Sequence, residues 1–98
     1  MFVKVMNSYR CIIAACDQEL IGKIFEEGKL QLNVKESFYK GDEIAEKEMI
    51  EFLQDYAKED ATFNLVGKEV IDSALKAGII KEENVGTIQN IPYALILL

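Results

Sequence analysis

The amino-acid sequence predicts an α+β fold, namely a small, mostly antiparallel sheet with two longer helices and one short helix packed against it. β-rich apolar stretches lie near both ends of the chain, and apolar and polar side chains alternate over residues 30–35, as in a strand with one buried face. Two long central stretches carry apolar side chains at helical spacing instead. Half of the 98 residues are apolar and one is proline, so we expect a single compact domain, residues 1–98.

A hairpin and the short helix are expected in the first third of the chain. Residues 2–6 and 11–16 are short, rich in β-forming residues and apolar on both faces, which is typical of buried strands. The short helix is predicted over residues 17–28. Asp17 is a good N-cap residue, apolar residues follow it at helical spacing, and Gly28 suits the position after a helix end.

The two longer helices and the last strands occupy the rest of the chain. After a turn at residues 37–41, an apolar stripe predicts a helix over about residues 42–58. A second helix is predicted over residues 62–77, with its first residue, a threonine, as N-cap and a glycine directly after its end. Residues 85–88 and 93–98 are predicted to be strands on either side of a turn.

Two Gly-Lys pairs, Gly22-Lys23 and Gly67-Lys68, could mark a phosphate site, an internal repeat or two packed helices. A phosphate loop places its glycines before a helix and a Ser or Thr after the lysine, and neither pair does so within the predicted helices. A glycine inside a helix costs about 0.5–1 kcal/mol relative to alanine, so it calls for a reason. We interpret Gly22 and Gly67 as positions of close helix packing; a catalytic or hinge role is the alternative.

The net charge of −6 is concentrated in one part of the chain. Residues 36–60 carry nine acidic and three basic side chains, whereas residues 1–35 carry four acidic and five basic ones. The overall negative charge disfavours binding to DNA, but the basic first third allows a local contact with a partner. The candidate binding residues are Lys23, Lys29, Lys35, Asn64 and Lys68. The alternative is that the lysines are solvated surface residues.

The absence of histidine excludes Ser-His-Asp and Cys-His catalysis and histidine-ligated metal sites. Cys11 and Cys16 would lie about 16 Å apart on one strand, too far for a disulfide, and two cysteines are too few for a closed zinc site. We therefore predict no catalytic residue, no metal and no cofactor. Cys16 is a candidate reactive thiol because it precedes a predicted helix N-terminus, where the thiolate is favoured; the alternative is a small buried hydrophobic side chain.

Four stretches, taken in order, resemble a small family of archaeal proteins known as domain of unknown function 424. They are CDQELIGKIFEEGKLQL at 16–32, FYKG at 38–41, NLVGKEVIDSALKAGII at 64–80 and ENVGTIQNIPYA at 83–94. The resemblance covers nearly the whole chain. It implies an archaeal cytoplasmic protein with an α+β fold, and it implies no established activity and no catalytic residues.

We expect a cytoplasmic protein, because no apolar run approaches the roughly 20 residues that span a bilayer and charged residues interrupt the apolar stretches near the N-terminus. The first hypothesis is a non-catalytic binding module that contacts a protein or ribonucleoprotein partner, and not a membrane. The second is a small enzyme or enzyme subunit that uses Cys16 or a lysine–carboxylate pair. The third is a self-assembling structural protein, held together through the apolar residues Tyr93 to Leu98.

Overall fold

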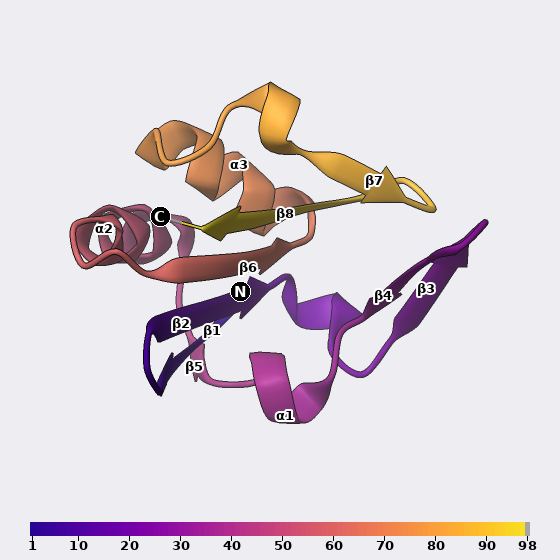
Figure 1. Ribbon diagram of the computed structural model, residues 1–98, viewed down its shortest axis with the longest axis horizontal. Helices are drawn as coiled ribbons and strands as arrows, with labels where there is room; N and C mark the ends of the chain where they lie inside the picture. Colours follow the sequence, from indigo (N-terminus) through magenta and orange to yellow (C-terminus); the bar gives the residue numbers. More distant parts are fainter. Residues whose placement is uncertain (98) are drawn as a thin grey trace.

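The centre of the protein is a six-stranded mixed sheet, seen in the computed structural model that describes residues 1–97 (Figure 1). Across the sheet the strands follow the order β5 (Asp42–Glu43), β1 (Phe2–Asn7), β2 (Cys11–Cys16), β6 (Thr62–Val66), β8 (Ile91–Leu97) and β7 (Gly86–Ile88). Neighbouring strands are antiparallel except β2 and β6, which are parallel. The predicted α+β fold is confirmed, with one parallel pair in a mostly antiparallel sheet.

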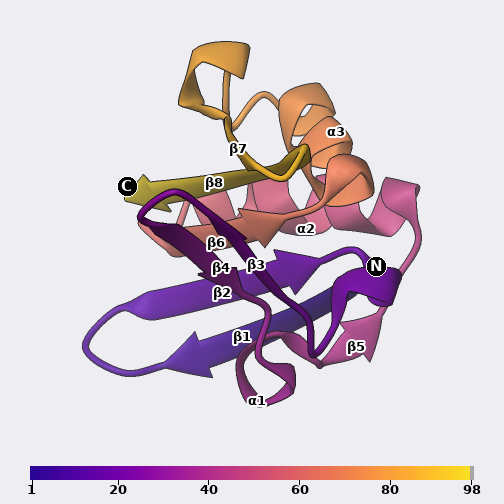
Figure 2. The ribbon, with the colours of Figure 1, turned by 90° about the vertical axis from the view of Figure 1, so that its right-hand side faces the viewer.

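Three helices and a separate hairpin lie against the two faces of this sheet (Figure 2). α2 (Glu46–Ala57) and α3 (Lys68–Ala77) pack against each other and cover one face, here called the helix face. The opposite face, here called the hairpin face, carries the single turn α1 (Glu36–Tyr39) and the two-stranded hairpin of β3 (Ile24–Glu27) and β4 (Leu30–Asn33). Among the described residues, no helix has the length and apolar character needed to span a lipid bilayer.

Each face of the sheet buries its own hydrophobic core, because successive side chains of a strand point to opposite faces. In β2, Ile13 and Ala15 belong to the core beneath α2 and α3, whereas Ala14 and Cys16 belong to the smaller core on the hairpin face. None of these four side chains has exposed area. β2 is therefore a central strand that is buried on both sides, as its continuous apolar run predicted.

The prediction of a short helix over residues 17–28 is wrong. The structure has a 3-10 turn, η1 (Gln18–Leu20), followed by β3, which pairs with β4 around a turn at Gly28. Gly22 has a φ of +80°, which ends any helical path there, and its N–H donates to Val34 O at 2.7 Å. The predicted helix would have only about three turns, and over so short a stretch helical spacing cannot be distinguished from the pattern of a half-buried strand.

The helix predicted over residues 62–77 begins later than expected. Thr62–Val66 is the strand β6, and α3 starts at Lys68. β6 lies between β2 and β8, and its Phe63 and Leu65 are buried beneath the helices. Pairing on both sides and burial of these side chains therefore override a helical spacing that the sequence also contains.

The remaining strands and the first long helix are confirmed with shifted ends, but the predicted turn over residues 37–41 is not. The helix predicted from residue 42 begins at Glu46, because Asp42 and Glu43 form the edge strand β5. Most of the stretch predicted as a turn before it forms α1 instead, so the short helix of the fold lies here and not after Asp17. β4 is the strand predicted at residues 30–35. β7 and β8 are the last two predicted strands and pair with each other; β8 begins at Ile91, not at residue 93, and Leu98 lies outside the described residues.

Candidate functional site

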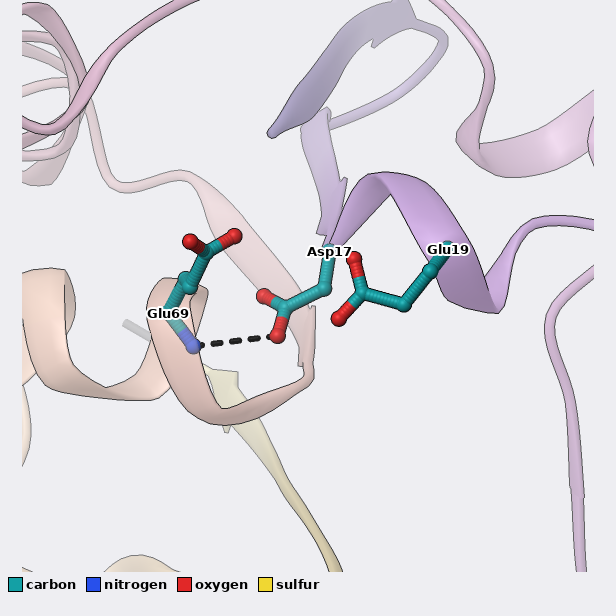
Figure 3. Close-up of side chains that lie close together, drawn as sticks. All are labelled: Asp17, Glu19 and Glu69. Atoms are coloured by element: carbon teal, nitrogen blue, oxygen red, sulfur yellow. Dashed lines mark hydrogen bonds between the residues drawn. The ribbon is translucent and has the colours of Figure 1, made fainter.

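The carboxyl ends of the parallel strands β2 and β6 lie side by side, and Asp17 and Gly67 directly follow them. The N–H of Asp17 donates to Val66 O at 3.1 Å, which continues the pairing by one residue. The Asp17 side chain points at the N-terminus of α3 (Figure 3), where Oδ2 accepts from Glu69 N–H at 3.0 Å and Oδ1 from Val70 N–H at 2.9 Å. Asp17 therefore caps α3, not the helix that the sequence predicted directly after it.

Gly67 is the residue that makes this close approach sterically allowed. Its φ of +109° and ψ of +156° lie in a region that glycine alone populates readily, and a Cβ at this position would overlap the Asp17 carboxyl group. Its N–H donates to Pro92 O at 2.8 Å, which ties the turn to β8. The interpretation of Gly22 and Gly67 as helix-packing glycines is wrong, because both residues lie in turns and a Cβ at Gly22 would meet nothing within 4 Å.

The Gly67-Lys68 pair does precede a helix, which the sequence interpretation denied. Even so, the amides of Glu69 and Val70 already donate to Asp17, and glutamate stands where a phosphate loop has Ser or Thr. The protein's own carboxylate occupies the position that a phosphate would take.

Two further carboxylates, those of Glu19 and Glu69, lie near Asp17 (Figure 3). Asp17 is 2% exposed and the other two are exposed, and one oxygen of each carboxylate lies within 4.8 Å of the others. Burial raises the pKa of Asp17, the two amide hydrogen bonds partly oppose that rise, and Glu19 adds to it. Lys68 lines the same cavity, of about 430 Å³. The cluster therefore combines oxygen ligands of the kind that hard divalent cations use with a lysine close to carboxylates.

The five predicted binding residues lie in separate places. Lys29 stands at the turn between β3 and β4, and Lys23 and Lys35 flank that hairpin. Lys68 begins α3, and Asn64 is the middle residue of β6. All four lysines are exposed and Asn64 is half-buried. The structure therefore does not unite these residues in one patch, and Asn64 is the member that lies on the hairpin face of the sheet.

The register of β1, β2, β6 and β8 arranges the side chains of the hairpin face in rows that run across the strands. The first row, here called the covered row, consists of Phe2, Cys16, Val66 and Tyr93. The second row consists of Lys4, Ala14, Asn64 and Leu95. The third row consists of Met6, Ile12, Thr62 and Leu97. Side chains of η1, α1 and the hairpin share a hydrophobic core with the covered row.

The part of the hairpin face away from the covered row stays open. Leu95 is 59% exposed and Leu97 is 69% exposed. The open face, as the term is used below, consists of Met6, Ile12, Asn64, Leu95 and Leu97. Thr62 lies among them in the third row but is only 9% exposed. Lys4 adjoins it, but its Nζ donates to Ser37 O at 2.6 Å. The open face is thus an apolar surface with one amide and no charged member.

Cys16 lies in the covered row and has no exposed area. Burial, followed by the neighbouring Asp17 carboxylate, raises the pKa of its thiol to about 11. The thiol is therefore protonated at neutral pH, and the element after it is a single 3-10 turn, not the predicted helix. This placement does not favour a reactive thiolate and fits the alternative of a small buried hydrophobic side chain.

Sequence reasoning missed the role of Asp17 at α3 and most of the open face, of which it had considered only the residues from Tyr93 to Leu98 as a possible contact. A signal for the first was present, because a β-rich stretch at residues 62–66, then glycine, then a helical pattern is typical of a strand–turn–helix unit. No local signal marks the open face, since its members come from four strands whose pairing is set by the whole fold.

Comparison with known proteins gives a family and a shared fold. A family model described as a protein of unknown function, DUF424, matches residues 7–98. The crystal structure of an uncharacterized conserved protein from Methanopyrus kandleri superimposes with a TM-score of 0.86 and 17% sequence identity, covering 97% of this chain and 88% of that chain. No curated protein matches. The similarity to the Methanopyrus structure therefore extends over almost the whole fold.

Proposed function

This chain belongs to the DUF424 family, as its motifs predicted, and we propose that it is a non-catalytic binding module that docks a protein partner, free or within a ribonucleoprotein, on the open face. Neither the family nor the structural neighbour supplies an activity, so the proposal depends on geometry. The observation that carries it is the exposure of Leu95 and Leu97 beside half-buried Met6 and Ile12. Contiguous exposed apolar surface is typical of interaction sites.

Burial of the two leucines supplies the driving force for docking. Removing a leucine side chain from water contributes about 1.5–3 kcal/mol when burial is complete. With roughly two thirds of each side chain exposed, Leu95 and Leu97 together offer a partner about 2–4 kcal/mol. Half-buried Asn64 adds an amide that can hydrogen-bond to the partner. We therefore propose a partner surface that is apolar and carries a few hydrogen-bonding groups.

Self-assembly through this face alone is a weaker candidate than docking of a different protein. Four strands about 4.8 Å apart and two rows about 6.8 Å apart give a flat area of roughly 250 Å², against about 800 Å² per partner in a stable interface. We therefore expect the isolated protein to be a monomer and a partner to reach beyond the open face.

We also place the protein in the cytoplasm of an archaeon, as the resemblance implied. Cys11 and Cys16 are both free, which suits a reducing compartment. This part of the proposal concerns location and is independent of docking on the open face.

The experiment that tests docking compares three forms of the immobilised protein in native cell extract. Leu95→Asp/Leu97→Asp places charge on the open face, and Ile24→Asp is the matched control, since Ile24 is 56% exposed but lies on the β3–β4 hairpin. A protein retained by wild type and by Ile24→Asp, and lost with the double variant, supports the proposal. Equal retention by all three forms contradicts it.

A ribonuclease treatment separates the two kinds of partner. Sedimentation of the native protein in a sucrose gradient, with and without ribonuclease, reports whether it travels with RNA-containing particles. Loss of co-sedimentation after ribonuclease identifies a ribonucleoprotein, whereas a complex that survives treatment identifies a protein partner. Migration as a small free species in both gradients contradicts a stable complex of either kind.

A second candidate is a small enzyme that uses a lysine–carboxylate pair. One observation favours it: Lys68 lines the same cavity as Asp17, Glu19 and Glu69. The test is a screen of small molecules by amide chemical shifts. Shifts confined to the turn from Gly67 to Glu69 support a ligand site there, and their absence for all compounds counts against it.

A further inference from the structure

The apolar surface that continues the open face lies beneath the β3–β4 hairpin. Alternate residues of a strand share a face, so Ile91 and Tyr93 precede Leu95 and Leu97 on the same side of β8. Ile91 and Tyr93 are half-buried in the core that the hairpin covers. The open face and this covered surface are thus two parts of one strip along β8.

The hairpin has few apolar attachments to the rest of the protein. β3 and β4 form a two-stranded sheet of their own and do not join the main sheet. Phe25 and Leu32 are half-buried against the core, whereas Ile24 and Leu30 are more than half exposed. A two-stranded hairpin has marginal stability by itself, so these attachments decide whether it stays in place.

A single polar residue holds the free end of the hairpin. Gln89, in the turn between β7 and β8, donates from its N–H to Glu27 Oε1 at 2.9 Å and from Nε2 to Glu26 O at 2.7 Å. Both strands of the hairpin also contact β7, whose Ile88 is 2% exposed and pairs with Ile91 of the hairpin-face core, so that it lies on the same side of the sheet. Gln89 thus acts as a latch on the segment that covers Ile88 and the first half of β8.

We infer that the β3–β4 hairpin is a flap that opens at the Gln89 latch while the rest of the protein stays folded. Opening would add Ile91 and Tyr93 to Leu95 and Leu97, giving a partner a longer apolar strip than the open face alone. The longer strip would enlarge the small area that the open face offers to a partner. In that respect the inference rests on the proposed function. The opening itself is a property of the isolated protein.

Thiol labelling of the isolated protein tests the flap without any partner. The background is Cys11→Ser/Cys16→Ala, and Ile88→Cys places a thiol beneath the hairpin. Local opening exposes little surface, so the labelling rate at low urea should depend only weakly on urea, unlike global unfolding. Adding Gln89→Ala should raise that rate about fivefold, because a side-chain hydrogen bond of the latch is lost.

The matched control is Gln31→Ala, which removes a hydrogen bond of 2.9 Å to Glu26 Oε1 inside the hairpin and leaves the latch intact. A rate increase with Gln89→Ala and a smaller one with Gln31→Ala supports the flap. Labelling that follows global unfolding at every urea concentration, or equal increases for the two variants, overturns it. If the Ile88→Cys variant does not fold, Tyr93→Cys serves as the reporter with the same expected outcomes. A rigid hairpin would leave the capture result with Leu95→Asp/Leu97→Asp unaffected, so the two proposals fail separately.

Discussion

The two halves of the hairpin face are both rich in apolar residues but differ in environment. In the covered row, Cys16 has no exposed area and Val66 is 1% exposed, whereas Leu95 and Leu97 are more than half exposed. The difference arises because the chain between β2 and β5 folds back as η1, the β3–β4 hairpin and α1 over one half of the face (Figure 2). Whether an apolar strand residue joins the core therefore depends on how far the covering segment reaches.

Because of this difference, we expect the covered half to determine stability and the open face to determine binding. The covered half adjoins the turn where Asp17 caps α3 and Gly67 lets it approach. Changes there should lower the free energy of unfolding. Changes on the open face should alter docking and leave stability nearly constant. Substitutions in the two halves therefore test whether stability and docking depend on different residues.

Gly67→Ala is expected to have the largest effect. The alanine Cβ would overlap the Asp17 carboxyl group, and the φ of +109° is unfavourable for any residue with a Cβ. We expect the free energy of unfolding to fall by about 2–5 kcal/mol, from about 1–3 kcal/mol of backbone strain and about 1–2 kcal/mol of lost capping. Thermal denaturation should show a midpoint lowered by more than about 8 °C.

Gly22→Ala is the matched control for that substitution. Gly22 also has a positive φ, of +80°, but a Cβ there meets nothing within 4 Å. The strain alone should cost about 1–2 kcal/mol. Equal losses for the two variants would mean that crowding against Asp17 contributes nothing.

High pH should weaken the covered half through Cys16. Its pKa rises from 9.0 to about 11 on folding, so the folded state holds the thiol proton more tightly than the unfolded state. The resulting stabilisation is complete below pH 9 and is lost as the pH rises to 11, a change of about 2–3 kcal/mol. Urea denaturation at pH 8 and pH 11 should show wild type losing that amount relative to Cys16→Ala. A constant difference would argue against a buried thiol.

Asp17→Ala should destabilise the protein by about 2 kcal/mol. The substitution removes the acceptor of the Glu69 and Val70 amides, and leaves a helix terminus without its cap. Denaturant unfolding measures the loss, and faster hydrogen exchange in the first turn of α3 localises it. Glu19→Ala is the control, because Glu19 is exposed and should change stability by less than about 0.5 kcal/mol. Similar losses for both variants would indicate that cluster charge, and not capping, matters.

The sequence was informative where structure is set by neighbours along the chain. Alternation and continuous apolar runs predicted β1, β2, β4 and the β7–β8 hairpin, and helical spacing predicted α2. Thr62 was misassigned as a helix cap because apolar side chains from Phe63 onward also fit helical spacing. These residues form a strand because β6 pairs on both sides, with β2 and with β8. Pairing between distant segments cannot be predicted from the spacing of apolar residues within one segment.

The candidate sites depend even more on distant contacts. Asp17 was recognised as a capping residue, but its partners stand 52 and 53 positions later, at Glu69 and Val70. The apolar C-terminal strand was also recognised as a possible contact, yet the sequence could not show which of its residues are exposed. Leu95 is open only because the segment after β2 stops short of it, and that reach is a property of the assembled fold.

The smallest effect on stability is expected for Leu97→Ala, and its comparison with Leu20→Ala tests the separation most directly. Both changes remove the same atoms from the hairpin face, but Leu97 is 69% exposed and Leu20, in η1, is 7% exposed. Leu20→Ala should cost about 2–4 kcal/mol, and Leu97→Ala less than about 1 kcal/mol, in denaturant unfolding. If Leu97 belongs to a docking surface, the Leu97→Ala variant should capture less of the partner although its stability is nearly unchanged. The Leu20→Ala variant should still capture the partner under conditions in which it is folded. Comparable losses of stability would instead make the open face part of the core.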